Sequence, residues 1–140
     1  MIGKDLSKFA VPVFFNEPES MLQKSAEAFE SGPCMTRVSK MHESSSKRLL
    51  YLTSGYVCFF RQLQGRLAKP FNPMLGETYE YVTDGGRFLA ECVAHHPPTF
   101  VCHVEGEGYE IIKISSPCPR FTGKRVEISE KYLMKIIISV

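Results

Sequence analysis

The feature that most limits what this chain can fold into is a change of hydrophobic period near residue 70. Beyond Pro73 apolar side chains recur at every second position, which is the period of a strand with one buried face. Two turn-forming clusters, Asp84-Gly85-Gly86 and Gly106-Glu107-Gly108, divide this half of the chain. Because short turns join neighbouring strands, the pattern predicts an antiparallel meander. The expected strands are Glu77–Thr83, Arg87–Ala94, Thr99–Glu105, Tyr109–Ser115, Phe121–Ile128 and Lys131–Val140.

The first half of the chain follows a helical period instead. Pro18 suits the start of a helix over Ser20–Glu30, which places Leu22, Ala26 and Phe29 on one face, and Gly32-Pro33 then ends it. A longer helix is expected from His42 to Leu63. We assign its apolar stripe to core packing: Leu49, Leu52, Tyr56, Phe60 and Leu63. The predicted fold class is therefore α+β and mainly β, with amino-terminal helices followed by an antiparallel sheet.

Length and composition indicate one globular domain and exclude several classes of protein. The 140 residues match a single domain, and 44% hydrophobic residues are enough for a core. With 17 basic against 15 acidic residues, a charge-driven nucleic-acid binder is not expected. Met134–Val140 is too short to span a membrane, and charges and Pro12 interrupt the amino end, so we expect no signal sequence. Five cysteines without a CxxC pair then predict free thiols in a reducing cytosol.

Basic residues are concentrated between Arg37 and Lys69. The stretch has one acidic residue, Glu43, against Arg37, Lys40, Lys47, Arg48, Arg61, Arg66 and Lys69. Such a run is usually the solvated face of a helix. The alternative is a surface that faces anionic lipid or a ligand that carries phosphate.

The segment Lys69–Thr78, with the sequence KPFNPMLGET, departs from simple patterning. Its two prolines fix the backbone and hold the residues before them in extended geometry. The loop is therefore rigid before any ligand arrives, and it presents the cation of Lys69, the amide of Asn72 and the carboxylate of Glu77. By composition it is either an ordered connection from helix to strand or a preorganised binding loop.

The segment Glu91–Pro98, with the sequence ECVAHHPP, holds a pair of histidines. On a regular strand His95 and His96 would point to opposite faces, but Pro97-Pro98 ends the strand and restrains the backbone of His96. Both imidazoles can then converge on one rim and donate hydrogen bonds to phosphate oxygens. Because a phosphate dianion favours the charged imidazole, such a site would respond to pH.

Two other interpretations of the histidine pair stay open on the residues alone. The histidines can simply be exposed at a strand end. A zinc site would draw on His95, His96, Cys92, Cys102 and His103, but their spacing fits no standard zinc motif. The chain also has no nucleophile elbow, phosphate loop or dinucleotide fingerprint, so we expect neither an enzyme nor a cofactor.

Together the two segments resemble the lipid-binding domain of the oxysterol-binding protein family. The hallmark of that family, Glu-Gln-Val-Ser-His-His-Pro-Pro, corresponds to Glu91–Pro98, and Lys69–Thr78 resembles a second conserved block. Further stretches match in the expected order, namely Ile2–Lys8, Phe15–Pro18 and Phe121–Lys124. Cys92 stands where the family usually has glutamine, and Ala94 where it usually has serine. We expect these two changes to remove supporting hydrogen bonds while the phosphate donors remain.

The resemblance also implies roles for single residues. In that family the histidine pair binds the 4-phosphate of inositol, a role that would fall to His95 and His96. The phosphate that joins inositol to glycerol would be held by Lys69 and Asn72. The remaining assignments are a lid segment near the glycerol, at Leu6 and Ser7, and supporting positions at Glu77, Pro97 and Pro98.

The resemblance implies a curved antiparallel barrel with an internal tunnel, of which this chain would form an incomplete part. Residues 1–19 correspond to a lid remnant and the segment that leads into the domain, residues 20–68 to helices, and residues 69–140 to barrel strands. Closing a barrel around a small ligand takes about eight or more strands. The family's carboxy-terminal strands, closing helices and Lys/Glu/Arg group have no counterpart, so we expect a fragment of a longer protein. Lys131–Val140 would then have an unpaired edge and be a site of pairing or aggregation.

The function implied is lipid binding and non-vesicular lipid transfer between membranes. The expected partners are phosphatidylinositol 4-phosphate, a sterol or another lipid, and an anionic membrane surface, with no nucleic acid. The expected location is cytoplasmic and peripheral, at membrane contact sites, the endoplasmic reticulum or the Golgi. Two alternatives are a zinc-dependent hydrolase that uses the His/Cys cluster and a membrane-recognition module without transfer activity.

Overall fold

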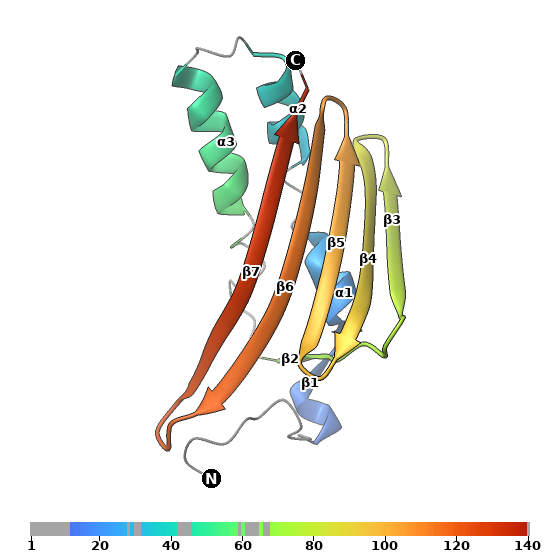
Figure 1. The fold of residues 1–140 in the computed structure, drawn as a ribbon, viewed down its shortest axis with the longest axis vertical. Helices are drawn as coiled ribbons and strands as arrows, with labels where there is room; N and C mark the ends of the chain where they lie inside the picture. The colour runs from blue at the N-terminus through green and yellow to red at the C-terminus, as the bar shows by residue number, and fades with distance from the viewer. Residues whose placement is uncertain are drawn as a thin grey trace.

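The computed structural model describes residues 12–27, 29, 32–41, 46–58, 60, 65 and 68–139. Figure 1 shows a long curved sheet with one helix across one face and two more helices beside one end. The sheet has five strands in the order β3-β4-β5-β6-β7, with each neighbouring pair antiparallel. The predicted meander is therefore confirmed. Its strands are β3 (Thr78–Thr83), β4 (Gly86–His95), β5 (Pro98–Gly106), β6 (Tyr109–Phe121) and β7 (Val126–Ile138).

The helices and a small second sheet precede the meander. These elements are η1 (Val13–Phe15), β1 (Asn16–Ser20), α1 (Met21–Ala26), α2 (Gly32–Ser39), α3 (Ser46–Cys58) and β2 (Lys69–Phe71). β1 and β2 pair in parallel, from Asn16↔Lys69 to Ser20↔Phe71, a pairing that the sequence pattern does not predict. α1 begins at a capping box, in which Ser20 and Gln23 each accept a hydrogen bond from the other's backbone N–H.

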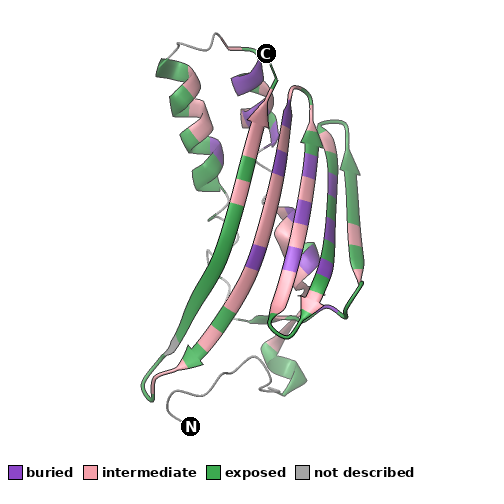
Figure 2. Cartoon of the chain, viewed as in Figure 1, coloured by how far each residue is buried: buried purple, intermediate pink, exposed green. Residues whose placement is uncertain are grey.

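The core lies between the first two helices and the sheet. Leu22 and Met35 are fully buried, and with Ala26 and Phe29 they cover one face of the sheet. The strands contribute Phe88, Ala90, Cys92, Phe100, Cys102, Val104, Tyr109 and Ile111. Buried positions recur at every second residue along β4 and β5, as Figure 2 shows. Each large apolar side chain buried in this way contributes about 1.5–3 kcal/mol, so α1 is held mainly by its packing on the sheet.

Two expectations about the first helix are wrong. Pro18 lies in β1, because the capping box places the helix start at Met21, and α1 ends already at Ala26. Gly32-Pro33 does not end a helix but begins α2. Proline is tolerated in the first turn of a helix, where its missing N–H has no partner to lose.

The apolar stripe on and after α3 is not core packing. Leu49, Tyr56 and Phe60 are 66%, 39% and 55% exposed, whereas Leu52 packs against the core; Leu63 lies outside the described residues. The one buried residue of α3 is Gly55, where an added Cβ would lie 2.7 Å from Met35 Cε. α3 therefore packs on α2 through its smallest side chain and leaves most of the apolar stripe uncovered.

The two strands expected after residue 120 are one. Phe121 ends β6, and β7 then pairs with β6 without interruption from Phe121↔Val126 to Tyr109↔Ile138. β6 also runs on through Pro117 and Pro119, beyond Ser115, the last residue at which it pairs with β5. Proline is accepted there because this part of the strand pairs on one side only.

The sheet is open, since β3 and β7 each have a neighbouring strand on one side only. In the described residues the chain thus forms part of a curved wall and not a closed barrel. None of the helices in this part of the chain is long and apolar enough to cross a bilayer.

Candidate functional site

The fold brings the two motif segments to one end of the sheet. β4 ends at His95, and a turn of two residues leads directly into β5 at Pro98. The loop of residues 72–77 runs beside β4: Gly76 N donates to Cys92 O at 2.8 Å, and Cys92 N donates to Glu77 O at 3.0 Å. Two segments that are apart in the sequence therefore share the end of the sheet where β3 begins and β4 ends (Figure 1).

The two histidines lie side by side and exposed. The ring centroids of His95 and His96 are 4.7 Å apart, and the ring planes are inclined by 58°. A β-bulge between Cys92 and Ala94 shifts the register of β4 just before the pair. Because the bulge and the turn break the strict alternation of a strand, both imidazoles open onto the same rim.

The loop of residues 72–77 is held by its own carboxylate. Glu77 Oε2 accepts a hydrogen bond from Met74 N at 2.9 Å, and Glu77 N donates to Met74 O at 3.0 Å. Pro73 is buried, whereas Lys69 and Asn72 are exposed. The cation and the amide are therefore presented outward from a fixed backbone, while the carboxylate of Glu77 faces its own loop. Leu6 and Ser7 lie outside the described residues.

Cys92 joins the two segments from the buried side. Its side chain is 1% exposed, and its Sγ donates to Ala94 O at 3.3 Å, across the bulge. Burial raises the pKa of the Cys92 thiol, and the negative charge of Glu77 raises it further. The thiol therefore stays protonated near neutral pH, where it is a weak hydrogen-bond donor and a poor nucleophile.

The residues of the alternative zinc site do not meet. Cys92 and Cys102 face the core, whereas His103 lies on the opposite face of β5, with its Nε2 2.8 Å from Glu110 Oε1. Among the described residues, no group of three or more His, Cys, Asp or Glu side chains is placed to hold a metal ion. The zinc-dependent hydrolase therefore has no assembled site in this part of the chain.

The basic stretch from Arg37 to Lys69 is divided between two ends of the molecule. Lys40 follows α2, and its Nζ lies 3.0 Å from the carboxylate of Glu107 in the β5–β6 turn. Lys69 lies in β2 at the other end (Figure 1). Arg61 and Arg66 lie outside the described residues.

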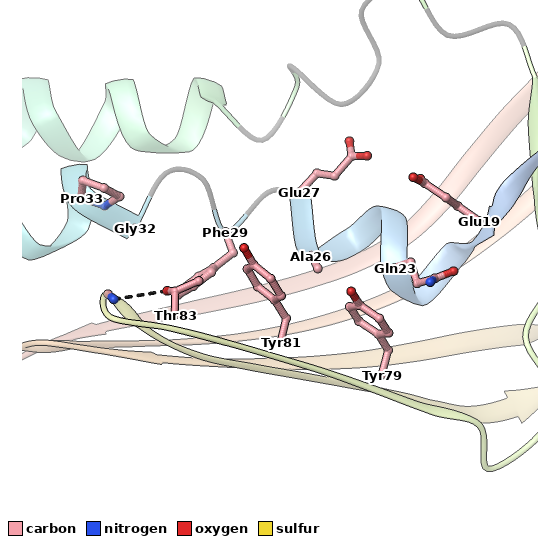
Figure 3. A pocket seen from close by; sticks show the side chains of 11 residues that line it. Glu19, Gln23, Ala26, Glu27, Phe29, Gly32, Pro33, Tyr79, Tyr81 and Thr83 are labelled. Atoms are coloured by element: carbon pink, nitrogen blue, oxygen red, sulfur yellow. Dashed lines mark hydrogen bonds between the residues drawn. The ribbon is translucent and has the colours of Figure 1, made fainter.

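A groove that the sequence did not indicate lies between α1 and β3 (Figure 3). Tyr79, Tyr81 and Thr83 occupy alternate positions on β3 and face α1, and the ring of Tyr81 meets that of Phe29 edge-on, with centroids 6.3 Å apart. The groove has a volume of about 530 Å³ and is lined by Glu19, Gln23, Ala26, Glu27, Phe29, Gly32, Pro33, Tyr79, Tyr81, Thr83 and Gly85. The period of two places Tyr79, Tyr81 and Thr83 on one face of β3, but it does not indicate the helix opposite them. None of the candidate lipid-binding residues assigned from the sequence lines this groove.

Comparisons with known proteins match almost the whole chain. The family model described as oxysterol-binding protein matches residues 1–139. Oxysterol-binding protein-related protein 1B of Arabidopsis thaliana is 40% identical over 131 residues, which are 91% of this chain and 27% of that protein. Oxysterol-binding protein homolog 1 of Saccharomyces cerevisiae is 36% identical over 140 residues, which are 99% of this chain and 12% of that protein.

Solved structures with the same fold lead to the same family. The Osh1 ORD domain in complex with ergosterol has a TM-score of 0.89 and 36% identity, over 99% of this chain and 33% of that one. The Osh3 ORD in complex with PI(4)P from Saccharomyces cerevisiae has a TM-score of 0.83 and 32% identity, over 96% of this chain and 37% of that one. The chain thus spans about a third of the solved domains and a smaller share of the curated relatives. Sequence and fold agree over nearly all of its residues, and the chain belongs to the oxysterol-binding protein family.

Proposed function

We propose that this chain binds the phosphorylated inositol head group of a membrane lipid at the end of the sheet that carries the histidine pair. The observation that supports this most directly is the double backbone hydrogen bond between Cys92 and residues 76 and 77, which ties both motif segments to one place. A relative of the same fold was solved in complex with PI(4)P. The proposed function is lipid binding and transfer without catalysis.

The chemistry of this end suits a phosphate dianion. The two exposed imidazoles can each donate a hydrogen bond to one phosphate, and the dianion favours their protonated form. Lys69 adds a cation and Asn72 an amide donor, which suits a second phosphate. The segments 69–76 and 92–99 contain no acidic residue that would repel a phosphate. The nearby carboxylate of Glu77 accepts a hydrogen bond from Met74 N within its own loop. A fixed loop and a fixed histidine pair lose little freedom on binding, which favours affinity.

A sterol or another lipid is the second ligand that we propose. A relative of the same fold, the Osh1 ORD domain, was solved in complex with ergosterol and with cholesterol. A phosphoinositide and a sterol that bind in turn would allow the exchange of one lipid for the other between two membranes. This exchange would take place at the cytoplasmic faces of closely apposed membranes, such as endoplasmic reticulum and Golgi contact sites.

We propose that transfer is carried out by a longer protein in which this sequence forms one part of the domain. α3 exposes Leu49, Leu50 and Val57 to 66%, 65% and 58%, and the sheet has two open edges. The chain spans 33% of the solved Osh1 ORD chain. Further strands paired to β7 would cover these apolar side chains and enclose a lipid tail, which an open sheet leaves in water.

The head-group assignment is tested by titrating the chain with a soluble short-chain phosphatidylinositol 4-phosphate, followed by calorimetry or NMR. The double variant His95→Ala, His96→Ala removes two charge-assisted hydrogen bonds worth about 1.5–3 kcal/mol each, so affinity should fall by at least roughly 100-fold. His103→Ala is the matched control, because His103 contacts Glu110 on the opposite face of the sheet. Equal affinity of the double variant and the unchanged chain would disprove the assignment.

Transfer is tested separately, with liposomes that contain the lipid. The longer protein should extract phosphatidylinositol 4-phosphate from them, and the double histidine variant should not. If this chain and the longer protein both bind the liposomes but neither extracts the lipid, the result would favour the membrane-recognition module instead.

A further inference from the structure

β6 and β7 extend well past the rest of the sheet. β5 pairs with β6 only as far as Phe100↔Ser115, whereas β6 and β7 stay paired to Phe121↔Val126. At about 3.3 Å per residue, this two-stranded arm projects roughly 20 Å beyond the last pairing with β5. Figure 1 shows the arm reaching past the β4–β5 turn. Its tip, Thr122–Arg125, is closed by two hydrogen bonds, from the backbone N and the hydroxyl of Thr122 to Arg125 O.

The topology places this tip at the same end as the histidine pair. In an antiparallel meander alternate turns share one end, so the β4–β5 and β6–β7 turns lie together. The β3–β4 and β5–β6 turns lie at the other end (Figure 1). The loop of residues 72–77 joins the first group, because β3 starts where β4 ends. The β4–β5 turn, the β6–β7 turn and the loop of residues 72–77 therefore form one end of the molecule, which we call the arm end.

The tip of the arm carries a net positive charge. Residues 117–126 contain Arg120, Lys124 and Arg125, all exposed, and no acidic residue. Arg125 lies 2.8 Å from Glu127 on the next strand, which leaves the tip with a net positive charge. The turns at the opposite end contain Asp84 and Glu107, and the cations Arg87 and Lys40 lie beside them. An anionic surface would therefore be attracted to the tip of the arm.

Exposed apolar side chains lie at the arm end as well. Phe14 and Phe15 in η1 are 77% and 57% exposed, directly before β1, which pairs with β2 at Lys69. Met74 and Leu75 are 74% and 66% exposed in the loop before β3. Apolar side chains on turns, beside cations, suit entry among lipid head groups and the outer part of the acyl chains. Met74 and Leu75 offer no aromatic ring on which a nucleic-acid base could stack.

We propose that this end is a docking surface for anionic bilayers. Arg120, Lys124 and Arg125 contact the head groups, and the exposed aromatic and aliphatic side chains of η1 and of the loop before β3 enter the interface. The inference rests on the proposed function, since docking this end sets the head-group site against the membrane that holds its lipid. The docking residues differ from those assigned to the inositol phosphates.

The test is sedimentation of the chain with phosphatidylcholine vesicles, with and without phosphatidylserine and always without phosphoinositide. The variant Lys124→Ala, Arg125→Ala should lower binding to the anionic vesicles roughly 30-fold, since each basic residue near an anionic surface contributes about fivefold. High salt should abolish most of this difference. Lys47→Ala, Arg87→Ala is the matched control, because it removes the same charge from exposed positions on α3 and at the β3–β4 turn. It should bind like the unchanged chain.

A second variant pair separates the apolar contribution from the charge. Phe14→Ser, Phe15→Ser should weaken binding to neutral and anionic vesicles alike, with little dependence on salt. Arg120→Ala, Lys124→Ala replaces the first variant if loss of Arg125, which pairs with Glu127, disturbs the turn. If the Lys124→Ala, Arg125→Ala variant binds anionic vesicles as well as the unchanged chain does, the inference is overturned. An equal loss of binding in the Lys47→Ala, Arg87→Ala control overturns it as well. Binding to RNA but not to anionic vesicles also overturns it.

Soluble phosphoinositide binding distinguishes this inference from the proposed function. The arm variant should bind short-chain phosphatidylinositol 4-phosphate like the unchanged chain. If the unchanged chain does not bind that lipid, the head-group assignment is wrong, whereas the vesicle result still decides the docking surface.

Discussion

Replacing Glu77 with alanine tests whether the loop of residues 72–77 is preorganised by a side chain. The carboxylate accepts the N–H of Met74 at 2.9 Å from within the loop, and it forms no hydrogen bond to any other residue in the described part of the chain. The variant keeps both backbone hydrogen bonds to Cys92, because these involve main-chain atoms only. It therefore loosens the turn that follows Asn72 while the attachment of the loop to β4 persists.

The magnitude follows from that one hydrogen bond. Hydrogen bonds to charged groups contribute about 1.5–3 kcal/mol, and partial exposure of Glu77 lowers this to about 1–1.5 kcal/mol. If the loosened loop must be reordered when a ligand binds, this free energy is lost from binding, and affinity falls about five- to tenfold. The loss at the histidine pair should be far larger, since there the donors themselves are removed.

Calorimetric titration with the short-chain phosphoinositide measures this change, with Glu77→Gln as the control. Glutamine keeps an oxygen acceptor for Met74 N but has no charge, so most of the affinity should remain. Unchanged affinity in Glu77→Ala would show that the prolines alone hold the loop. An equal loss in the glutamine variant would show that charge, and not position, is what Glu77 contributes.

Three further changes test the packing, the ionisation and the open edge. Leu22→Ala should lower the free energy of unfolding in urea by about 2–5 kcal/mol, because Leu22 is fully buried between α1 and the sheet; a loss below about 1 kcal/mol would contradict that packing. Burial raises the pKa of Tyr132 from 10.0 to about 12, so the unfolded chain releases this proton first and stability should fall as the pH rises from 10 to 12. In urea titrations, Tyr132→Phe should lose less free energy of unfolding over this pH range than the unchanged chain. An identical loss would show that Tyr132 is not the group responsible. Ile128→Lys, at a 70% exposed position of β7, should reduce concentration-dependent association in sedimentation velocity, and an unchanged profile would show that β7 is not the contact.

The hairpins of the sheet were predictable because their turns have local causes. Gly86 has φ of +146°, and an added Cβ there would overlap Glu105 O; Gly108 has φ of +76°. Both positions therefore favour glycine, and both stand in the clusters from which the turns were predicted. The pairing of β1 with β2 has no such local cause, since it joins two short segments about fifty residues apart in sequence and shows no alternation of apolar side chains.

The exposed apolar stripe of α3 shows a second limit of prediction from the sequence pattern. A helical period tells which side chains share a face, but it does not tell whether anything covers that face. Leu49 and Phe60 fit the pattern of a core stripe, yet Gly55 makes the buried contact. The candidate site was open to prediction for a similar local reason, since prolines mark both of its loops. The hydrogen bonds that join these loops depend on the register Thr78↔Glu91, which sequence patterning cannot supply.

The position of Cys92 in the fold changes how its difference from the family's usual glutamine is interpreted. Its side chain points into the core, away from the rim where the imidazoles lie, so the loss of a longer polar side chain there removes no direct contact with a phosphate. The thiol also keeps one hydrogen bond, to Ala94 O, within the bulge that turns both histidines to one side. Position 92 would therefore act on the proposed head-group site through the shape of the backbone before His95. The cysteine side chain, small and protonated, fills the core there and supports the bulge.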